Sequence, residues 1–201
     1  MILKNIYLRR GIKTIFSNLS LEFKSPGINI IKGENGSGKT SLLLMISSLI
    51  PPDEGYIFRV NSLKLNDWLN EHILIKQNIS LSKELTIEEN LKIWCGIKGW
   101  DIDQKKIEKN LDSFGIHKFK NFFLSECSAG IKKKVELCKL NFEESFNLKC
   151  WLLDEPLNHL DDKGKLKLKD IIDKFIQMNG TILMTSHDRT INHENFKLIQ
   201  L

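Results

Sequence analysis

The residues with the clearest chemical potential form the glycine-rich segment GENGSGKT at positions 33–40, which matches the pattern G-x-x-x-x-G-K-[ST] at every fixed position. Successive backbone N–H groups of such a loop hold phosphate oxygens, and glycines permit the positive φ angles that this requires. The ammonium of Lys39 reaches the β- and γ-phosphates, and the Thr40 hydroxyl is a hard oxygen ligand suited to Mg²⁺. We therefore predict a nucleotide-binding site at this segment, the phosphate loop. Its predicted binding residues are Gly33, Glu34, Asn35, Gly36, Ser37, Gly38, Lys39, Thr40 and Ser41.

Two adjacent carboxylates, Asp154 and Glu155, end the apolar run at 150–153. Parallel α/β sheets bind ligands at the carboxyl ends of their strands, so Asp154 is predicted to lie beside the phosphate loop and to hold Mg²⁺. Glu155 is predicted to face the γ-phosphate and to polarise the attacking water in an in-line displacement. The alternative is an acidic turn after a core strand, which the presence of the phosphate loop makes the weaker interpretation.

Hydrophobic periodicity predicts the elements that position these residues. A helical pattern over residues 40–49 follows the phosphate loop directly and stops at Pro51. A second helix over 163–178 precedes Gly180, which fits its C-terminal cap region. Apolar runs predict strands on either side of these helices, and this alternation favours a parallel α/β core. The predicted strands cover residues 2–8, 19–23, 27–32, 56–60, 149–153 and 181–186.

The middle of the chain, residues 86–140, has amphipathic helical spacing instead. Thr86 and Glu89 are spaced as a capping box, which marks the start of a helix. Ile107, Leu111 and Phe114 lie on one face of a further helix. We therefore expect an inserted helical subdomain within the α/β core.

Composition narrows the class of protein. The 201 residues include 30 Lys and Arg against 25 Asp and Glu, and a net charge of +5 is too weak a bias to indicate nucleic-acid binding. The four cysteines lack C-x-x-C spacing and are predicted to be buried or semi-buried free thiols in a reducing compartment. The N-terminus lacks the apolar core of a signal peptide. The longest apolar run, 42–50, is shorter than the roughly 20 residues that span a bilayer. We expect a soluble chain that meets a membrane only through a partner.

In order and type, these motifs resemble those of the ATP-binding cassette (ABC) ATPases, over nearly the whole chain. The segment CSAGI at 127–131 is similar to the family signature L-S-G-G-Q, from which Cys127 and Ile131 depart. The segment LNHLD at 157–161 resembles the family's D-loop, and TSHD at 185–188 resembles its switch-histidine motif. The resemblance implies an α/β P-loop NTPase (RecA-like) core with an N-terminal antiparallel β part and an inserted α-helical subdomain. It implies one domain, with a core lobe of about 1–80 and 145–201 and a helical subdomain of about 81–144.

The resemblance also implies roles for individual residues. Gln77, with Asn78 as an alternative register, would contact Mg²⁺ and the lytic water, next to a groove where a permease helix docks. His187 would contact the γ-phosphate, and Asp161 would lie at a dimer interface. Trp94 and Trp100 either line the permease groove or pack in the core. The signature residues that would clamp the γ-phosphate bound by the opposite subunit are Ser128, Ala129 and Gly130.

One family feature is missing from this sequence. The family stacks adenine on an aromatic side chain before the phosphate loop, where this chain has Arg9, Arg10 and Gly11, and Tyr7 lies slightly too early. Arg10 stacking through its planar guanidinium and a loosely held base are the two alternatives.

Within the family, the chain resembles the ATP-binding subunit of the bacterial cytochrome c maturation system, the haem-exporter ATPase. Shared features are the compact size, the S-A-G signature, and the ELTIEENL segment followed by Trp94. The resemblance implies Mg²⁺-dependent ATP hydrolysis by an ATP-sandwich dimer, coupled to an integral-membrane permease at the cytoplasmic face of the inner membrane.

Other functions stay open on the sequence alone. The five histidines form no ligand pattern for haem, so direct haem binding is not expected, nor is nucleic-acid binding. The alternatives are transport of another cargo (a lipoprotein, peptide or metal), a soluble non-transport ABC ATPase, and a non-hydrolysing regulatory cassette. The intact Lys39, Asp154, Glu155 and His187 argue against the last.

Overall fold

The computed structural model describes residues 1–60, 64–186 and 196–201. The chain divides into two compact units. The first contains Met1–Leu74, Leu148–Glu155 and Asn179–Leu201, and the second contains Ile75–Asn147 and Pro156–Met178. Each unit therefore draws on segments that are far apart in the sequence.

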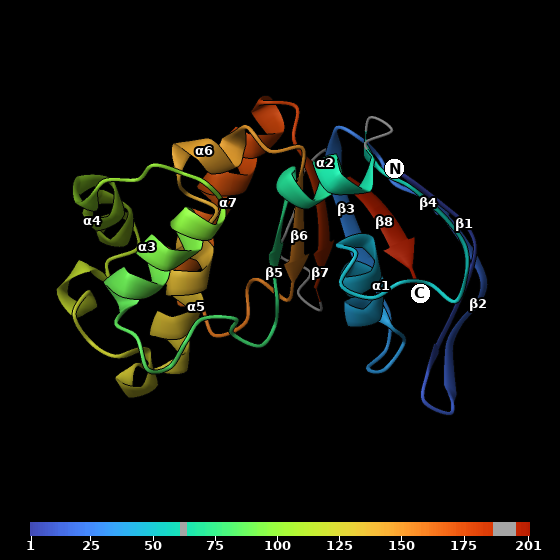
Figure 1. Cartoon of the computed structure of the whole chain (residues 1–201), viewed down its shortest axis with the longest axis horizontal. Helices are drawn as coiled ribbons and strands as arrows, with labels where there is room; N and C mark the ends of the chain where they lie inside the picture. The colour runs from blue at the N-terminus through green and yellow to red at the C-terminus, as the bar shows by residue number, and fades with distance from the viewer. Residues whose placement is uncertain (61–63, 187–195) are drawn as a thin grey trace. The chain divides into compact units, whose positions relative to one another are not determined.

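The first unit contains two β-sheets (Figure 1). The strands are β1 (Ile2–Arg10), β2 (Lys13–Glu22), β3 (Gly27–Lys32), β4 (Glu54–Phe58), β5 (His72–Ile75), β6 (Cys150–Asp154), β7 (Thr181–Thr185) and β8 (Phe196–Gln200). In the smaller sheet, β1 pairs in antiparallel fashion with β2 on one side and β4 on the other. In the larger sheet, of order β5-β6-β7-β3-β8, β3 pairs in parallel with β7 and β8, and β6 with β7. The carboxyl ends of β3 and β6, which precede the predicted site residues, therefore meet at the same edge.

The helix α1 (Lys39–Ile46) lies between the two sheets and joins them in one core (Figure 1). Its fully buried Leu42 and Leu43 belong to a hydrophobic cluster that includes side chains from both sheets. The helix is shorter than the predicted range of 40–49, because Ser48 takes a left-handed conformation with φ 68°. The indole N–H of Trp68, in α2 (Leu65–Asn70), donates to the Ile46 carbonyl at 2.8 Å. This bond satisfies one of the carbonyls that a helix leaves without an internal partner at its end.

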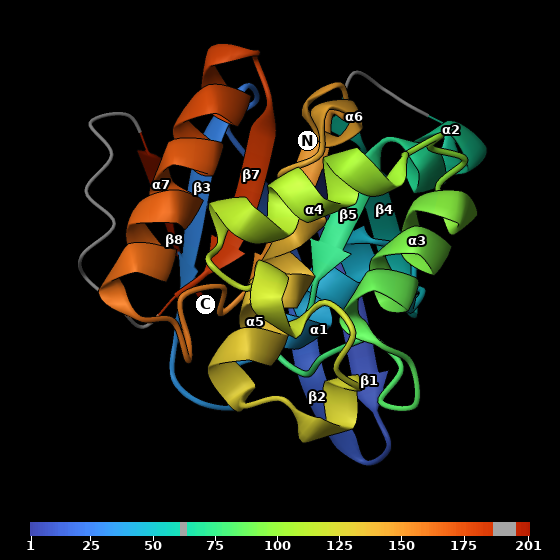
Figure 2. The ribbon, with the colours of Figure 1, turned by 90° about the vertical axis from the view of Figure 1, so that its left-hand side faces the viewer.

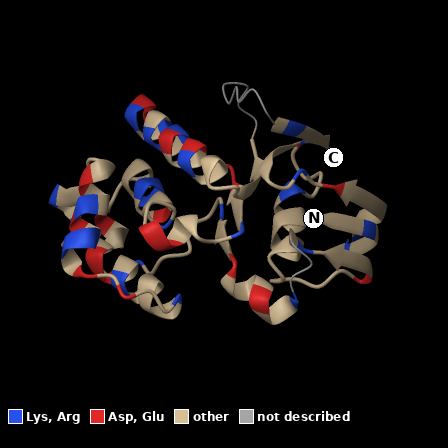
Figure 3. Ribbon diagram, turned by 90° about the horizontal axis from the view of Figure 1, so that it is seen from above, with Lys and Arg blue, Asp and Glu red and all other residues tan. Residues whose placement is uncertain are grey.

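The second unit is helical, and α3, α4 and α5 pack against one another (Figure 2). The α-helices are α3 (Ile87–Ile97), α4 (Gln104–Ser113), α5 (Ala129–Cys138), α6 (Glu143–Phe146) and α7 (Asp162–Gln177), and 3₁₀ turns cover His117–Phe119 and Leu124–Glu126. The predicted capping box is confirmed, since Thr86 and Glu89 exchange side chain-to-backbone hydrogen bonds. Acidic and basic residues are interspersed along α7 (Figure 3).

The end of α7 differs from the sequence prediction. The helix ends at Gln177, and Asn179 rather than Gly180 takes the left-handed conformation, with φ 61°. Asparagine tolerates this conformation better than most side chains. Gly180 instead accepts a hydrogen bond at its carbonyl from the N–H of Gly27, at the start of β3.

The four cysteines are buried and form no disulfide, as the sequence predicted. Burial raises the pKa of the Cys95 thiol to about 12, so this thiol forms a thiolate less readily than an exposed cysteine. Within the described ranges, no helix combines the length and hydrophobicity that crossing a bilayer requires.

Candidate functional site

The phosphate loop joins β3 to α1 through two glycines that hold it in a compact turn. Gly36 has φ 81° and Gly38 has φ 102°, conformations that side chains with a Cβ rarely adopt. A Cβ on Gly38 would lie 2.6 Å from the Ile15 side chain and 2.8 Å from the Phe16 ring. The β2 strand therefore packs directly against the start of α1, and only glycine fits there.

A Gly38→Ala substitution is expected to lower the free energy of unfolding by about 2–4 kcal/mol, from backbone strain plus overpacking against β2. Thermal unfolding measures this effect. Gly99→Ala is the matched control, because Gly99 also has a positive φ but a Cβ there would meet nothing within 4 Å. Equal losses in the two variants would show that the contact with β2 contributes nothing.

Lys39 is buried to 9 % exposure, and its ammonium folds back over the phosphate loop. It donates to the Gly33 carbonyl at 2.8 Å and to the Glu34 carbonyl at 3.0 Å. A second cation, Lys13 at the start of β2, donates to the Gly36 carbonyl at 3.3 Å. The motif pointed to Lys39 but not to Lys13, whose nearness depends on the β1–β2 hairpin. Both ammonium groups lie where phosphate oxygens would be attracted.

Asp154 links the end of β6 to the first turn of α1. Its Oδ2 accepts a hydrogen bond from the Thr40 hydroxyl at 2.8 Å, and its Oδ1 accepts one from the Thr185 hydroxyl at 2.7 Å. Asp154 as a whole is 2 % exposed. Asp154 and Thr40 are therefore adjacent hard oxygen ligands, and they lie on the same side of the sheet as Lys39.

Glu155 follows Asp154 in a left-handed conformation with φ 47°, and it is buried. Its backbone N–H donates to the Thr185 hydroxyl at 2.9 Å. Thr185 therefore holds both carboxylate residues in place, a role that sequence reasoning did not assign to it. The available signal was a hydroxyl side chain directly after the apolar run 182–184. Non-glycine residues in strained conformations cluster at functional sites.

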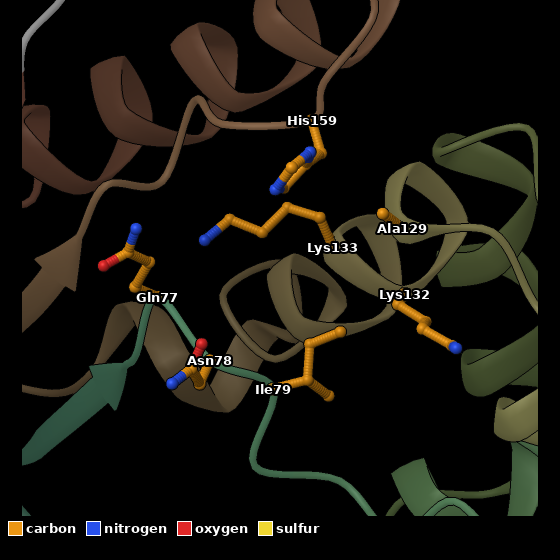
Figure 4. Close-up of a pocket in the computed structure, with 7 residues that line it drawn as sticks. All are labelled: Gln77, Asn78, Ile79, Ala129, Lys132, Lys133 and His159. Atoms are coloured by element: carbon orange, nitrogen blue, oxygen red, sulfur yellow. The ribbon is translucent and has the colours of Figure 1, made fainter.

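The second unit brings Gln77 and the signature segment together around a pocket of about 230 Å³ (Figure 4). Lys133 is buried and extends across the pocket toward Gln77, while the His159 ring enters from another side. Among the residues that the structure describes, the lining contains basic and polar groups but no carboxylate. Its residues are Gln77, Asn78, Ile79, Ala129, Lys132, Lys133 and His159.

The predicted signature residues form the start of α5. Ser128 is its N-cap and accepts a hydrogen bond from the Ile131 N–H at 3.3 Å. A Cβ on Gly130 would lie 3.0 Å from the His159 carbonyl, and His159 itself has φ 64°. The signature and the predicted D-loop are therefore in close backbone contact within this unit.

Asp161 is the N-cap of α7 and forms an ion pair with α5. Its Oδ1 accepts from the Gly164 N–H at 2.8 Å, and its Oδ2 accepts from the Lys134 ammonium at 2.9 Å. The hydrogen bond from Lys134, followed by that from Gly164, holds the pKa of Asp161 below its usual range. Since more than half of its side chain is exposed, the ion pair adds little to stability, and the cap is its main structural contribution.

We expect Asp161→Ala to lower the free energy of unfolding by about 1 kcal/mol at neutral pH, through loss of the cap. Because the folded pKa is depressed, this stabilisation is complete above the unfolded value of about 4 and is lost as pH falls through the lower folded pKa. Chemical denaturation at a series of pH values measures it. Asp162→Ala is the control, and an equal loss in both variants would contradict the capping role.

The remaining predicted residues are placed as follows. Trp94 and Trp100 are half-buried and meet edge to face, with ring centroids 5.1 Å apart. His187 lies outside the described residues. The second unit contains Gln77, Ser128 and Asp161, and the first contains Lys39, Thr40, Asp154 and Glu155.

Among the described residues, no group of three or more His, Cys, Asp or Glu side chains could hold a metal ion. The Thr40–Asp154 pair would thus rely on other ligands.

The sequence profile described as "ABC transporter" matches residues 16–158. The chain belongs to the ABC transporter family. Among curated relatives of this ABC subunit, the cytochrome c biogenesis ATP-binding export protein CcmA of Rickettsia bellii is 36% identical, covering 94% of this chain and 93% of the relative. CcmA of Nitrosomonas europaea is 30% identical, covering 94% and 88%. These relatives confirm the predicted resemblance, and the chain belongs with them to the CcmA group of ABC ATPases.

Solved structures agree with this assignment at the level of fold. The dimeric structure of MJ0796, a bacterial ABC transporter cassette, superposes with a TM-score of 0.80 at 23% identity, covering 99% of this chain and 94% of that one. A post-hydrolysis state of MJ0796 bound to ADP and Pi gives 0.76 at 24% identity, covering 93% and 88%. The predicted P-loop NTPase fold of the ABC ATPase is therefore confirmed.

Proposed function

We propose that this ABC ATPase powers a haem-linked export step of cytochrome c biogenesis, through an integral-membrane permease at the cytoplasmic face of the inner membrane. The names of the CcmA relatives support the process. ATP hydrolysis is supported by one observation: hydrogen bonds hold the phosphate loop, Asp154 and Glu155 together at one edge of the sheet. ATP lies across this edge, with its phosphates on the loop amides.

Three site residues of the first unit have distinct roles in hydrolysis. Lys39 moves from its loop carbonyls to the β- and γ-phosphates, where it balances negative charge as the terminal bond breaks. Glu155 accepts a hydrogen bond from the attacking water and takes its proton. Thr185 keeps both carboxylate residues in the required orientation through its two hydrogen bonds.

The same edge fits Mg²⁺. The Thr40 hydroxyl and the Asp154 carboxylate, with oxygens 2.8 Å apart, are the ligand types that this ion prefers. Thr40 and Asp154 would hold the ion together with Gln77, which the family resemblance adds. When bound there, Mg²⁺ would supply positive charge that offsets the negative charge of the phosphates. We expect chelation of Mg²⁺ to lower the rate of ATP hydrolysis by at least about 100-fold, and addition of Mg²⁺ to restore the rate. An assay of phosphate release measures both changes.

Two copies close head to tail around two ATP molecules. The γ-phosphate bound by one copy meets Ser128 of the partner subunit, with the N–H groups that open the partner's α5. Asp161 lies near this interface. Closure completes the site, and hydrolysis with phosphate release lets it open. A monomer therefore hydrolyses ATP slowly.

Co-purification from the native host tests this function. We expect the chain to bring down a multi-spanning membrane protein, and haem-dependent cytochrome c assembly to stop when Lys39 is replaced by Ala. Recovery of a permease for a lipoprotein, peptide or metal, with cytochrome c assembly intact, would show that the cargo is different. The ATPase activity would still stand. Recovery of ribosomes or DNA without a membrane protein would contradict transport altogether.

A further inference from the structure

A buried charged network in the second unit fixes the segment that follows Gln77. Glu136, in the last turn of α5, accepts two hydrogen bonds at Oε1 from Ser80, from its N–H at 2.6 Å and from its hydroxyl at 2.9 Å. The Lys139 ammonium donates to Glu136 Oε2 at 2.7 Å and to the Ser80 hydroxyl at 3.0 Å. It also lies 5.5 Å from the centroid of the Trp94 ring. The Glu136–Lys139 pair thus connects α5 with α3, through Trp94, and with the chain after Gln77, through Ser80.

Burial makes this network unusual. Glu136 is 0% exposed and Lys139 is 2% exposed. Burial lowers the pKa of Lys139, and the Glu136 charge partly offsets this effect. Apolar residues of similar volume often serve stability as well as a buried ion pair does. Stability alone therefore does not account for a carboxylate at this position, whereas a fixed hydrogen-bond acceptor for Ser80 does.

The network adjoins the residues that line the pocket. Gln77, Asn78 and Ile79 line the pocket on one side, and Ala129, Lys132 and Lys133 line it from α5 (Figure 4). Ser80 follows Ile79 directly in the chain, and Glu136 lies on the same helix as the signature segment. The Ser80–Glu136 bonds therefore tie the wall that carries Gln77 to the helix that carries Ser128.

We propose that Glu136 is a positioning residue for hydrolysis, which fixes Gln77 relative to the signature helix through Ser80. This inference rests on the proposed ATPase function, and it adds a residue that the family motifs do not contain. Glu136 acts through Ser80 and does not touch nucleotide. Its loss displaces Gln77 without altering the phosphate loop, so it lowers kcat and leaves KM for ATP unchanged.

Two matched double variants of the full chain separate positioning from packing. Both replace Lys139 by Met, which removes the buried cation while keeping its volume. Glu136→Gln then retains an acceptor oxygen for Ser80, whereas Glu136→Leu removes it. We expect Glu136→Gln/Lys139→Met to keep kcat within about twofold of wild type. We expect Glu136→Leu/Lys139→Met to lose about 10- to 100-fold in kcat with KM within about twofold, because small misplacement of a reacting group has such effects.

Hydrogen exchange of the backbone amides at 77–80 provides a readout that is independent of activity. Faster exchange in the Glu136→Leu/Lys139→Met variant than in the Glu136→Gln/Lys139→Met variant is the expected result. Equal exchange in the two variants, or equal kcat while both are folded by circular dichroism, would overturn the inference. A wild type that binds ATP but never hydrolyses it would instead refute the proposed function, and the exchange rates would still decide the role of Glu136.

Discussion

A Glu155→Gln variant should bind ATP with Mg²⁺, lose about 10²- to 10⁴-fold in the rate of hydrolysis and accumulate as an ATP-bound dimer. Glutamine has nearly the same shape as glutamate but does not accept the proton of the attacking water. The backbone N–H of residue 155 still donates to Thr185, so the strained conformation at φ 47° is kept. Dimers that form on ATP then have no chemical step by which to open.

Size-exclusion chromatography with ATP and Mg²⁺ and single-turnover hydrolysis measure these two effects. Glu54→Gln, in the exposed β4 strand of the same unit, is the control for loss of one negative charge. It should hydrolyse ATP like the wild type and show no added dimer. A Glu155→Gln protein that stays monomeric under the same conditions would count against the ATP-sandwich mechanism.

Replacement of Lys39 by Ala should abolish measurable ATP binding, with a rise of at least about 100-fold in the dissociation constant. Charge-assisted hydrogen bonds are the strongest in proteins, at about 1.5–3 kcal/mol each, and Lys39 is expected to make more than one to the phosphates. The substitution also removes the donor that holds the Gly33 and Glu34 carbonyls. The loop then loses both its ligand contact and an internal brace.

Titration calorimetry with ATP measures the affinity, and circular dichroism verifies that the variant folds. Lys32→Ala is the matched control, since Lys32 is a partly buried lysine at the end of β3 just before the loop. It should bind ATP within about threefold of wild type. Comparable loss of affinity in both variants would indicate a general electrostatic effect rather than a specific contact by Lys39.

The parts of the fold that follow from local sequence were predictable. The phosphate loop, the capping box at Thr86 and the strands β3, β6 and β7 each have a signal within a few residues. β5 and β8 were not predicted, because β5 has only four residues and β8 has only one buried side chain, so neither forms a long apolar run. α2 was also not predicted, since its position depends on the buried Trp68, whose indole N–H donates to the Ile46 carbonyl.

The candidate site divides in the same way. Lys39, Thr40, Asp154 and Glu155 come from motifs with fixed local spacing. Their supporting partners come from elsewhere in the chain: Thr185 is 31 residues from Asp154, and Ser80 is 56 residues from Glu136. No local pattern encodes such pairs, so only the tertiary structure reveals them.

The close approach of Gly130 to the His159 carbonyl makes the two small residues of the signature unequal. A methyl group at position 130 would press on that carbonyl, whereas Ala129 faces a pocket with room beside it. Sequence libraries built on this scaffold should therefore accept larger residues at 129 and reject them at 130. Inhibitors that bind in the helical unit should likewise tolerate added groups on the side that faces Ala129.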